Sequence, residues 1–258
     1  MKIAIPQNSI YNLILKNVDE VCKSNNIELI KVTPERAGDL FRKRLVDVAL
    51  LSPLDYFRGM GKGDYRIIPG ACLAVQGYSG LLSLNFKPNL RTINNSSVDF
   101  DNEYLLSITR ILLAERYDMI IEFVKDSANL EEALAKYDAA LLLNHPSEGS
   151  LDISEDWFLS YDLPLPLAYW VGINEEFDSE INEYIQLFAG TDEENQELEI
   201  IQSDTDEERN GKYLFKWNDI HKEALERTAD LFYYHTLVSE IADINVADIN
   251  LETKIIRD

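Results

Sequence analysis

The chain of 258 residues is strongly acidic: 24 lysines and arginines stand against 46 aspartates and glutamates, and the formal net charge is −22. Nucleic acids and anionic membranes bind through clustered lysine and arginine, so this charge argues against both kinds of partner. It still permits an anionic small molecule, because one pocket can be locally positive in a negative protein. Hydrophobic residues make up 46%, which suffices for one large domain or two small ones.

The cysteines and the first residues bear on cofactors and location. Only Cys22 and Cys72 are present, without zinc-binding spacing, and nothing supports a metal or an organic cofactor. The apolar run near the N-terminus is too short for a signal-peptide core, and no segment approaches about 18 uninterrupted apolar residues. We therefore expect a soluble, cytoplasmic protein that binds a small molecule and no membrane. The oligomeric state stays open.

The first third of the chain alternates short apolar runs with amphipathic stretches, which predicts strands followed by helices. We expect strands at 2–6, 27–32, 46–52 and within 64–86, and helices at 9–25, 34–45 and 53–60. This order predicts an α/β fold with a largely parallel sheet and helices on its faces.

A second series follows with the same alternation. We expect strands at 91–100, 119–124, 138–144 and 165–173, helices at 102–117, 129–137 and 217–240, and a solvated loop or frayed helix at 191–208. The late strand at 165–173 suggests that the chain builds a second lobe and then returns to the first. We therefore expect one lobe from 1–88 with about 171–258, another from 89–170, and a ligand cleft between them.

Two candidate residues follow strands of the first lobe. Asn8 stands before a predicted helix, where it is either an ordinary N-cap or part of a helix N-terminus aimed at an anionic ligand. Ser52 stands at the carboxyl end of a predicted strand, the end at which α/β proteins bind ligands, and it also suits a helix cap.

The stretch "VQGYSG" at 75–80 predicts either a plain turn or backbone held close to a ligand, and Gly77, Tyr78 and Ser79 are its candidates. The predicted helix near residue 102 begins with Asp101 and Asn102. Acidic and amide side chains suit a first turn, and cation binding would need further converging carboxylates, which the sequence does not indicate.

A third predicted strand end carries Asn144 and His145. Histidine titrates near neutral pH, so His145 is a candidate acid or base; a surface position or a place in the core is the alternative. His235 falls on the predicted terminal helix, and we expect it to be structural.

Several stretches resemble the menaquinone-biosynthesis family of chorismate dehydratases and their relatives in the futalosine route. "VDVALLSPLDYFR" (46–58), "DYRIIPGACLAVQG" (64–77), "ITRILLAERY" (108–117), "DAALLLNH" (138–145) and "DISEDWFLSYDLPLPLAYW" (152–170) match family patterns in order and spacing. The resemblance implies the two-lobe architecture of type 2 periplasmic binding proteins, working in the cytoplasm. It also implies elimination of water from chorismate to give an enolpyruvyl-benzoate, which makes an active chain a carbon–oxygen lyase, with Asn8 matching the family's catalytic asparagine.

The chain departs from the family where the dianionic substrate binds. A family pattern like "DTSSRTS" corresponds to "DFDNEYL" (99–105), and a family arginine is replaced by Gly80. Carboxylates facing a dianion would repel it. Two hypotheses follow: a divergent dehydratase in which His145 is an added acid or base, or a non-catalytic protein of the same fold that binds a neutral or cationic ligand.

Overall fold

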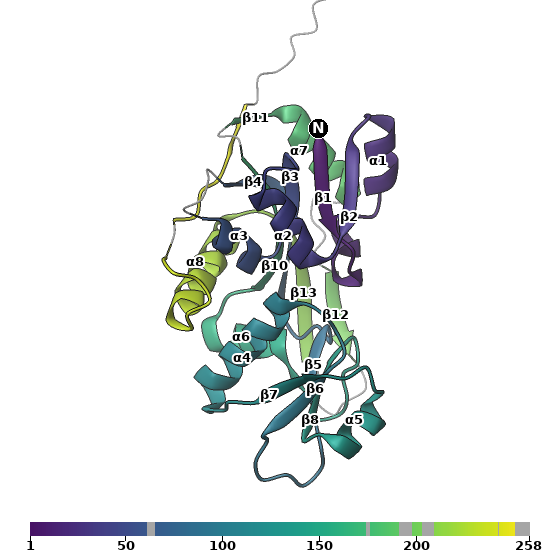
Figure 1. Ribbon diagram of the computed structural model, residues 1–258, viewed down its shortest axis with the longest axis vertical. Helices are drawn as coiled ribbons and strands as arrows, with labels where there is room; N and C mark the ends of the chain where they lie inside the picture. Colours follow the sequence, from purple (N-terminus) through teal and green to yellow (C-terminus); the bar gives the residue numbers. More distant parts are fainter. Residues whose placement is uncertain (61–64, 174–175, 191–197, 203–208, 242, 251–258) are drawn as a thin grey trace, which may run out of the picture. The chain divides into compact units, whose positions relative to one another are not determined.

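The computed structural model describes residues 1–60, 65–173, 176–190, 198–202, 209–241 and 243–250 (Figure 1). Its contacts divide the chain into two compact units. Unit 1 comprises Met1–Ala74, Pro166–Gln196 and Leu214–Asp258, and unit 2 comprises Val75–Leu165 and Glu197–Tyr213. Residues 75–88 thus group with unit 2, whereas the sequence placed them in the first lobe.

The larger sheet has the strand order β12-β13-β4-β10-β3-β1-β2, in which β12 is Leu198–Gln202, and unit 1 holds β1, β2, β3 and most of β4 and β10. The strands are β1 (Lys2–Pro6), β2 (Glu28–Val32), β3 (Val48–Leu51), β4 (Arg66–Gly77), β10 (Leu165–Gly172) and β13 (Arg209–Lys216). β1 pairs in parallel with β2 and β3, as predicted, but β10 pairs antiparallel with β3. A further short parallel pair joins β11 (Glu176–Asp178) to β14 (Asp248–Asn250).

Two helices of unit 1 begin at the residues expected from the sequence, Pro34 and Pro53, whereas the helix at 179–189 was not predicted. They are η1 (Ser9–Ile14, a 3-10 helix), α1 (Val18–Ser24), α2 (Pro34–Arg42), α3 (Pro53–Gly59), α7 (Ser179–Ala189) and α8 (Asp219–Tyr234). Thr33 and Ser52 cap α2 and α3, each followed by proline in the first turn, where its missing N–H has no intrahelical partner to lose. α2 packs on β1 and β3.

Unit 2 holds a smaller sheet with the order β7-β6-β8-β5-β9. Its strands are β5 (Leu82–Phe86), β6 (Asn95–Val98), β7 (Glu122–Lys125), β8 (Ala139–Leu143) and β9 (Leu151–Asp152), and its helices are α4 (Glu103–Tyr117), α5 (Leu130–Lys136) and α6 (Ile153–Tyr161). β6 is parallel to β7 and β8, and β5 is antiparallel to β8. In Figure 1, α4 and α6 lie on one side of this sheet and α5 lies on the other.

Two predicted elements differ in the structure. The single helix expected at 9–25 is divided, because η1 ends at Ile14 and α1 begins only at Val18. The loop or frayed helix expected at 191–208 is wrong for Leu198–Gln202, which form β12 and pair antiparallel with β13. The rest of that stretch, 191–197 and 203–208, lies outside the described residues.

The proline-containing segment before β10 follows a buried tryptophan. The resemblance suggests an exposed helix turn around Trp157, but this side chain is fully buried, and its Nε1 donates to the carbonyl oxygen of Pro164 at 3.1 Å. Every residue of β10 is buried. The indole therefore satisfies a carbonyl just before the strand that returns to unit 1.

Candidate functional site

In unit 1, Asn8 and Ser52 follow adjacent strands. β1 and β3 are parallel, with Ile3 opposite Val48, so their carboxyl ends reach the same edge of the sheet. This edge is where open α/β sheets bind ligands. The topology therefore brings the two predicted residues of the first lobe to one edge.

Asn8 is a helix cap in the structure. Its Oδ1 accepts a hydrogen bond from the backbone N–H of Ile10 at 3.1 Å, at the start of η1. The amide nitrogen of the same side chain is left for other partners, since the cap uses only the oxygen.

Ser52 belongs to a buried polar network. Its Oγ accepts from the N–H of Asp55 at 3.2 Å and donates to Asp55 Oδ2 at 3.0 Å, while Arg42 Nη1 donates to Asp55 Oδ1 at 3.1 Å. Burial raises the pKa of Asp55 to about 6 although the guanidinium and the hydroxyl oppose this. At neutral pH the carboxylate is ionised and paired, so Ser52 is fully occupied by its own helix.

In unit 2, three predicted segments reach one edge of the sheet. β6 and β8 are parallel, with Val98 opposite Leu141, and β5 runs antiparallel beside β8. The turn before β5, the residues after β6 and the residues after β8 are therefore neighbours. The N–H of Asn144 donates to the carbonyl oxygen of Leu81 at 2.9 Å, which ties two of these segments together.

The turn from Gly77 to Gly80 is held by the start of α6. Gly77 has φ +75°, and an added Cβ would lie 2.5 Å from the carbonyl oxygen of Asn210, so the turn requires glycine there. Ser154 Oγ lies 2.8 Å from the carbonyl oxygen of Gly77 and 2.8 Å from Ser79 Oγ. Asp152 accepts from the N–H of Gly80 at 2.7 Å.

Asp152 itself is buried, and burial raises the pKa of its carboxyl, although donors from Ser154, Glu155 and Gly80 lower it. This residue caps α6 and also organises the glycine turn. Sequence reasoning did not select Asp152, because its bond to Gly80 joins residues that are 72 positions apart.

The ring of Tyr78 is covered by the guanidinium of Arg209, which is distant in the sequence. The guanidinium carbon of Arg209 lies 4.1 Å from the Tyr78 ring centroid, and the same guanidinium pairs with Glu155. Tyr78 is 1% exposed, and its hydroxyl has no hydrogen-bond partner among the described residues. The arginine that the family pattern places in the glycine turn is thus absent, but Arg209 brings a positive charge to the same turn.

Asp101 and Asn102 stand at the start of α4. Asn102 is buried, and its Oδ1 accepts from the N–H of Leu105 at 3.1 Å. Asp101 is exposed and pairs with Lys125 of β7 at 2.8 Å. In the sheet, β7 and β8 lie on opposite sides of β6, so this pair holds the Asp101 carboxylate away from the β8 side.

Asn144 and His145 follow β8 and are both exposed. Asn144 has φ +55°, a left-handed conformation that redirects the chain, and the carbonyl oxygen of His145 accepts from Asn85 Nδ2 at 3.2 Å. Asp99 lies close by: burial raises the pKa of its carboxyl, and the backbone of Leu143 and the charge of His145 lower it. The Oδ1 atom of Asp99 is buried without a hydrogen-bond partner among the described residues.

The described residues contain no group of three or more His, Cys, Asp or Glu that could hold a metal ion. None of the helices in the described ranges has the length and apolarity that a membrane crossing requires. The strand ends of unit 2 carry hydroxyl, amide, carboxyl and imidazole groups that can bind a ligand and transfer protons.

Similar solved structures define the fold. The periplasmic aliphatic sulphonate binding protein SsuA from Escherichia coli superposes with TM-score 0.56 at 14% identity, covering 95% of both chains. The alkanesulfonate-binding protein SsuA from Xanthomonas axonopodis pv. citri, bound to MOPS, gives 0.53 at 10% identity over 95% of this chain and 96% of that one. Protein AF1704 from Archaeoglobus fulgidus gives 0.50 at 16% identity over 73% of each chain. The chain is an α/β protein with the two-lobe fold of periplasmic binding proteins.

A family model described as menaquinone biosynthesis matches residues 9–203. This range covers well over half of the chain, and the chain belongs to that family. The resemblance found in the sequence is confirmed. No curated protein matches the sequence.

Proposed function

We propose that the chain is a divergent chorismate dehydratase, a hydro-lyase of menaquinone biosynthesis that converts chorismate to an enolpyruvyl-benzoate. Membership of the menaquinone-biosynthesis family supports the pathway. The observation that carries the reaction is the ion pair between Asp101 and Lys125. This pair answers the main objection from the sequence, because the lysine neutralises a carboxylate that would otherwise repel a dianion.

The start of α4 supplies the remaining attraction for an anion. A helix of 15 residues presents a positive dipole end at its first turn, which favours an anion. Asn102 caps this helix, since its Oδ1 accepts from the N–H of Leu105. Arg209 adds a guanidinium at the glycine turn of the same unit.

Elimination of water needs a base for the departing ring proton and an acid for the leaving hydroxyl. In the proposal, His145 carries one of these proton transfers, and the carboxyl of Asp99 lies close to it. The C–H and C–O bonds break, the proton and the hydroxyl group leave together as water, and the product ring becomes aromatic. Asn8 of unit 1 is the proposed counterpart of the family's catalytic asparagine, and its amide nitrogen is the group that would act.

The direct test is to incubate the full chain with chorismate and to detect the dehydrated product by chromatography and mass spectrometry. We expect product above a control without protein, and a loss of about 10²–10⁴-fold in kcat for His145→Ala. His235→Ala, at the half-buried C-cap of α8, is the matched control and should keep the rate. No product from the folded chain would overturn the proposal.

Asn8 needs its own control because its cap contributes about 1 kcal/mol to stability. Asn129 caps α5 in the same way, since its Oδ1 accepts a hydrogen bond from the N–H of Glu132 at 3.0 Å. We expect Asn8→Ala to abolish turnover and Asn129→Ala to keep it, at similar losses of stability. Equal turnover in both variants would remove Asn8 from the mechanism.

Asp99 is the reason to carry a second candidate, a non-catalytic protein that binds a neutral or cationic ligand. Its buried Oδ1, without a partner among the described residues, suits a ligand that donates a hydrogen bond. No product, together with an unchanged melting temperature in chorismate, would favour this candidate. Product formation would rule it out.

A further inference from the structure

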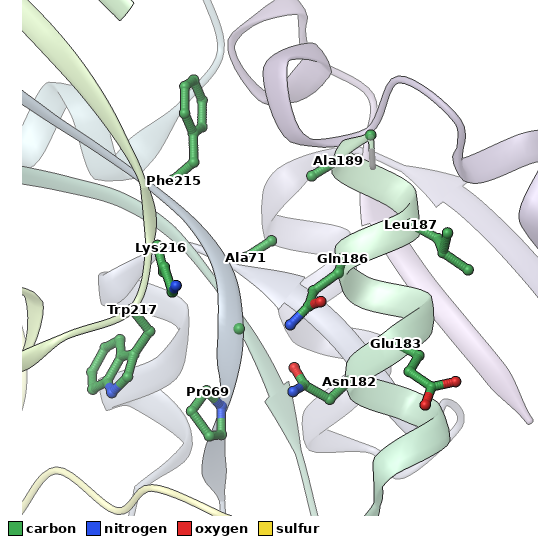
Figure 2. Close-up of a pocket in the computed structure, with 12 residues that line it drawn as sticks. Pro69, Ala71, Asn182, Glu183, Gln186, Leu187, Ala189, Phe215, Lys216 and Trp217 are labelled. Atoms are coloured by element: carbon green, nitrogen blue, oxygen red, sulfur yellow. The ribbon is translucent and has the colours of Figure 1, made fainter. Parts of the chain in front are cut away.

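Unit 1 contains a groove that shares no residue with the candidate site. Its volume is about 610 Å³, and it lies between α7 on one side and β4 with the end of β13 on the other (Figure 2). Cavities of this size hold metabolite-sized ligands. Its lining residues are Pro69, Gly70, Ala71, Asn182, Glu183, Gln186, Leu187, Ala189, Gly190, Phe215, Lys216 and Trp217.

Small residues of β4 keep the groove open. Gly70 has no side chain, and a Cβ there would lie 2.5 Å from Asn182 Oδ1 and 3.5 Å from Ile185 Cγ2. The adjacent Ala71 is also small. β13 is tied to the same point, because the N–H of Trp217 donates to the carbonyl oxygen of Gly70 at 3.0 Å. The hollow thus follows from the residues chosen for this part of β4.

The middle of the groove is lined by hydrogen-bond donors. Asn182 and Gln186 are one turn apart on α7 and point toward β4, and Lys216 extends into the same space from β13 (Figure 2). Asn182 Oδ1 is turned against Gly70 and has no partner among the described residues, which leaves the amide nitrogen as the group that can reach a ligand. Two amide nitrogens and an ammonium can all donate to one carboxylate.

The groove contains a positively charged side chain, Lys216, although the protein as a whole is negatively charged. Among the residues that the structure describes, no carboxylate forms an ion pair with Lys216. Glu183 lies one residue from Asn182 on α7, but its side chain points away from the gap (Figure 2). The walls around the donors are apolar, formed by Pro69, Ala71 and Phe215. The groove thus combines one ammonium and two amide side chains with apolar walls, while the Glu183 side chain points away from the gap (Figure 2).

We propose that this groove is a second ligand site, which takes a small organic carboxylate with an apolar body. Its carboxylate is bound by Lys216, with Asn182 and Gln186 as further donors, and its body lies against Pro69, Ala71 and Phe215. The proposal does not depend on the reaction assigned to the strand-end edges, because the two sets of residues do not overlap.

Nuclear magnetic resonance of the full isotope-labelled chain tests the site with benzoate as the probe and benzamide as its neutral counterpart. We expect benzoate to shift the amide signals of Gly70 and Gly190 and the indole signal of Trp217 in one saturable transition. Benzamide should bind at least about tenfold more weakly, since a charge-assisted hydrogen bond is lost.

Lys216→Gln is the decisive variant, because the side chain is exposed and the change leaves the core intact. It should weaken benzoate binding by at least about tenfold. Lys222→Gln is the matched control and should change the dissociation constant by no more than about twofold, since this exposed lysine of α8 does not line the groove. Unmoved groove signals at about 10 mM benzoate, or equal binding by Lys216→Gln, would overturn the proposal. The amide signals of unit 2, which contains Tyr78, Asn102 and His145, report separately on binding at the candidate functional site.

Discussion

Both units bury an aspartate at the start of a helix that follows a strand, but they neutralise it differently. In unit 1, Asp55 is paired with the guanidinium of Arg42 and with Ser52. In unit 2, Asp152 is bound by neutral donors from Gly80, Ser154 and Glu155. The nearby Arg209 pairs with Glu155 instead.

The two networks differ in whether all of their buried polar groups have hydrogen-bond partners. The network of unit 1 is closed, since each polar group around Ser52 has a partner within the unit. Unit 2 leaves the Tyr78 hydroxyl and one oxygen of Asp99 without partners among the described residues. Buried groups of that kind cost stability unless a ligand or water satisfies them, and unit 1 has such atoms outside this network, among them Asn182 Oδ1 in the groove.

The largest effect should come from breaking the ion pair of unit 1. Arg42→Ala leaves the Asp55 carboxylate buried without a counter-charge, and we expect the free energy of unfolding to fall by about 3–5 kcal/mol. Chemical denaturation at neutral pH measures this loss. Asp39→Ala removes the exposed partner of the same arginine and should cost under about 1 kcal/mol. Similar losses in both variants would contradict the closed network.

The corresponding change in unit 2 should have a smaller effect, because no buried charge is stranded. In Asp152→Asn an amide group faces donors that need acceptors, and at least one buried N–H or hydroxyl loses its bond. We expect a loss of about 1–3 kcal/mol in the free energy of unfolding. A loss as large as that of Arg42→Ala would mean that Asp152 depends on its charge as much as Asp55 does.

The pH dependence of stability contains two opposed contributions from unit 1. His221 is fully buried, and burial lowers its pKa to about 4, so the unfolded chain binds this proton more tightly. Stability from His221 is therefore lost as the pH falls from about 6.5 towards 4. Asp55 acts in the other direction: its folded pKa of about 6 exceeds the unfolded value, so its contribution is full below about 4 and lost as the pH rises through 6.

Replacing His221 should expose this balance. In His221→Phe we expect the stability at pH 5, relative to pH 7.5, to improve by about 2 kcal/mol over the parent chain, because one proton uptake on unfolding disappears. Chemical denaturation at pH 5 and pH 7.5 measures the difference in the free energy of unfolding. A change in packing affects both pH values equally and therefore cancels. An unchanged difference would mean that His221 titrates normally in the folded chain.

Local patterns predicted the elements whose cause is local. β1, α2, β3 and α3 lie where alternation, the first-turn prolines and the cap of Ser52 place them. β12 was missed because its partner strand, β13, lies beyond an acidic run with no clean period. Trp157 was misread because the carbonyl that it bonds, on Pro164, comes near only when α6 packs.

The candidate site divides in the same way. Asn8, Ser52 and His145 could be selected from the sequence because they follow strands, and the topology brings them to strand-end edges. Arg209 could not, since 130 or so residues separate it from the Tyr78 ring that it covers. The ion pair of Asp101 with Lys125 was hidden for the same reason, because it depends on the parallel pairing of β6 with β7.

The smallest effect should come from Tyr78→Phe, and its sign is informative. The Tyr78 hydroxyl is buried without a partner among the described residues, so its removal relieves an unmet hydrogen bond. The phenyl ring still offers its face to Arg209, and we expect the free energy of unfolding to stay level or rise by less than about 1 kcal/mol. A clear loss of stability would mean that the hydroxyl is satisfied in solution. A fall in turnover at unchanged stability would instead mark Tyr78 as a ligand group, because only the bound state would then supply its missing partner.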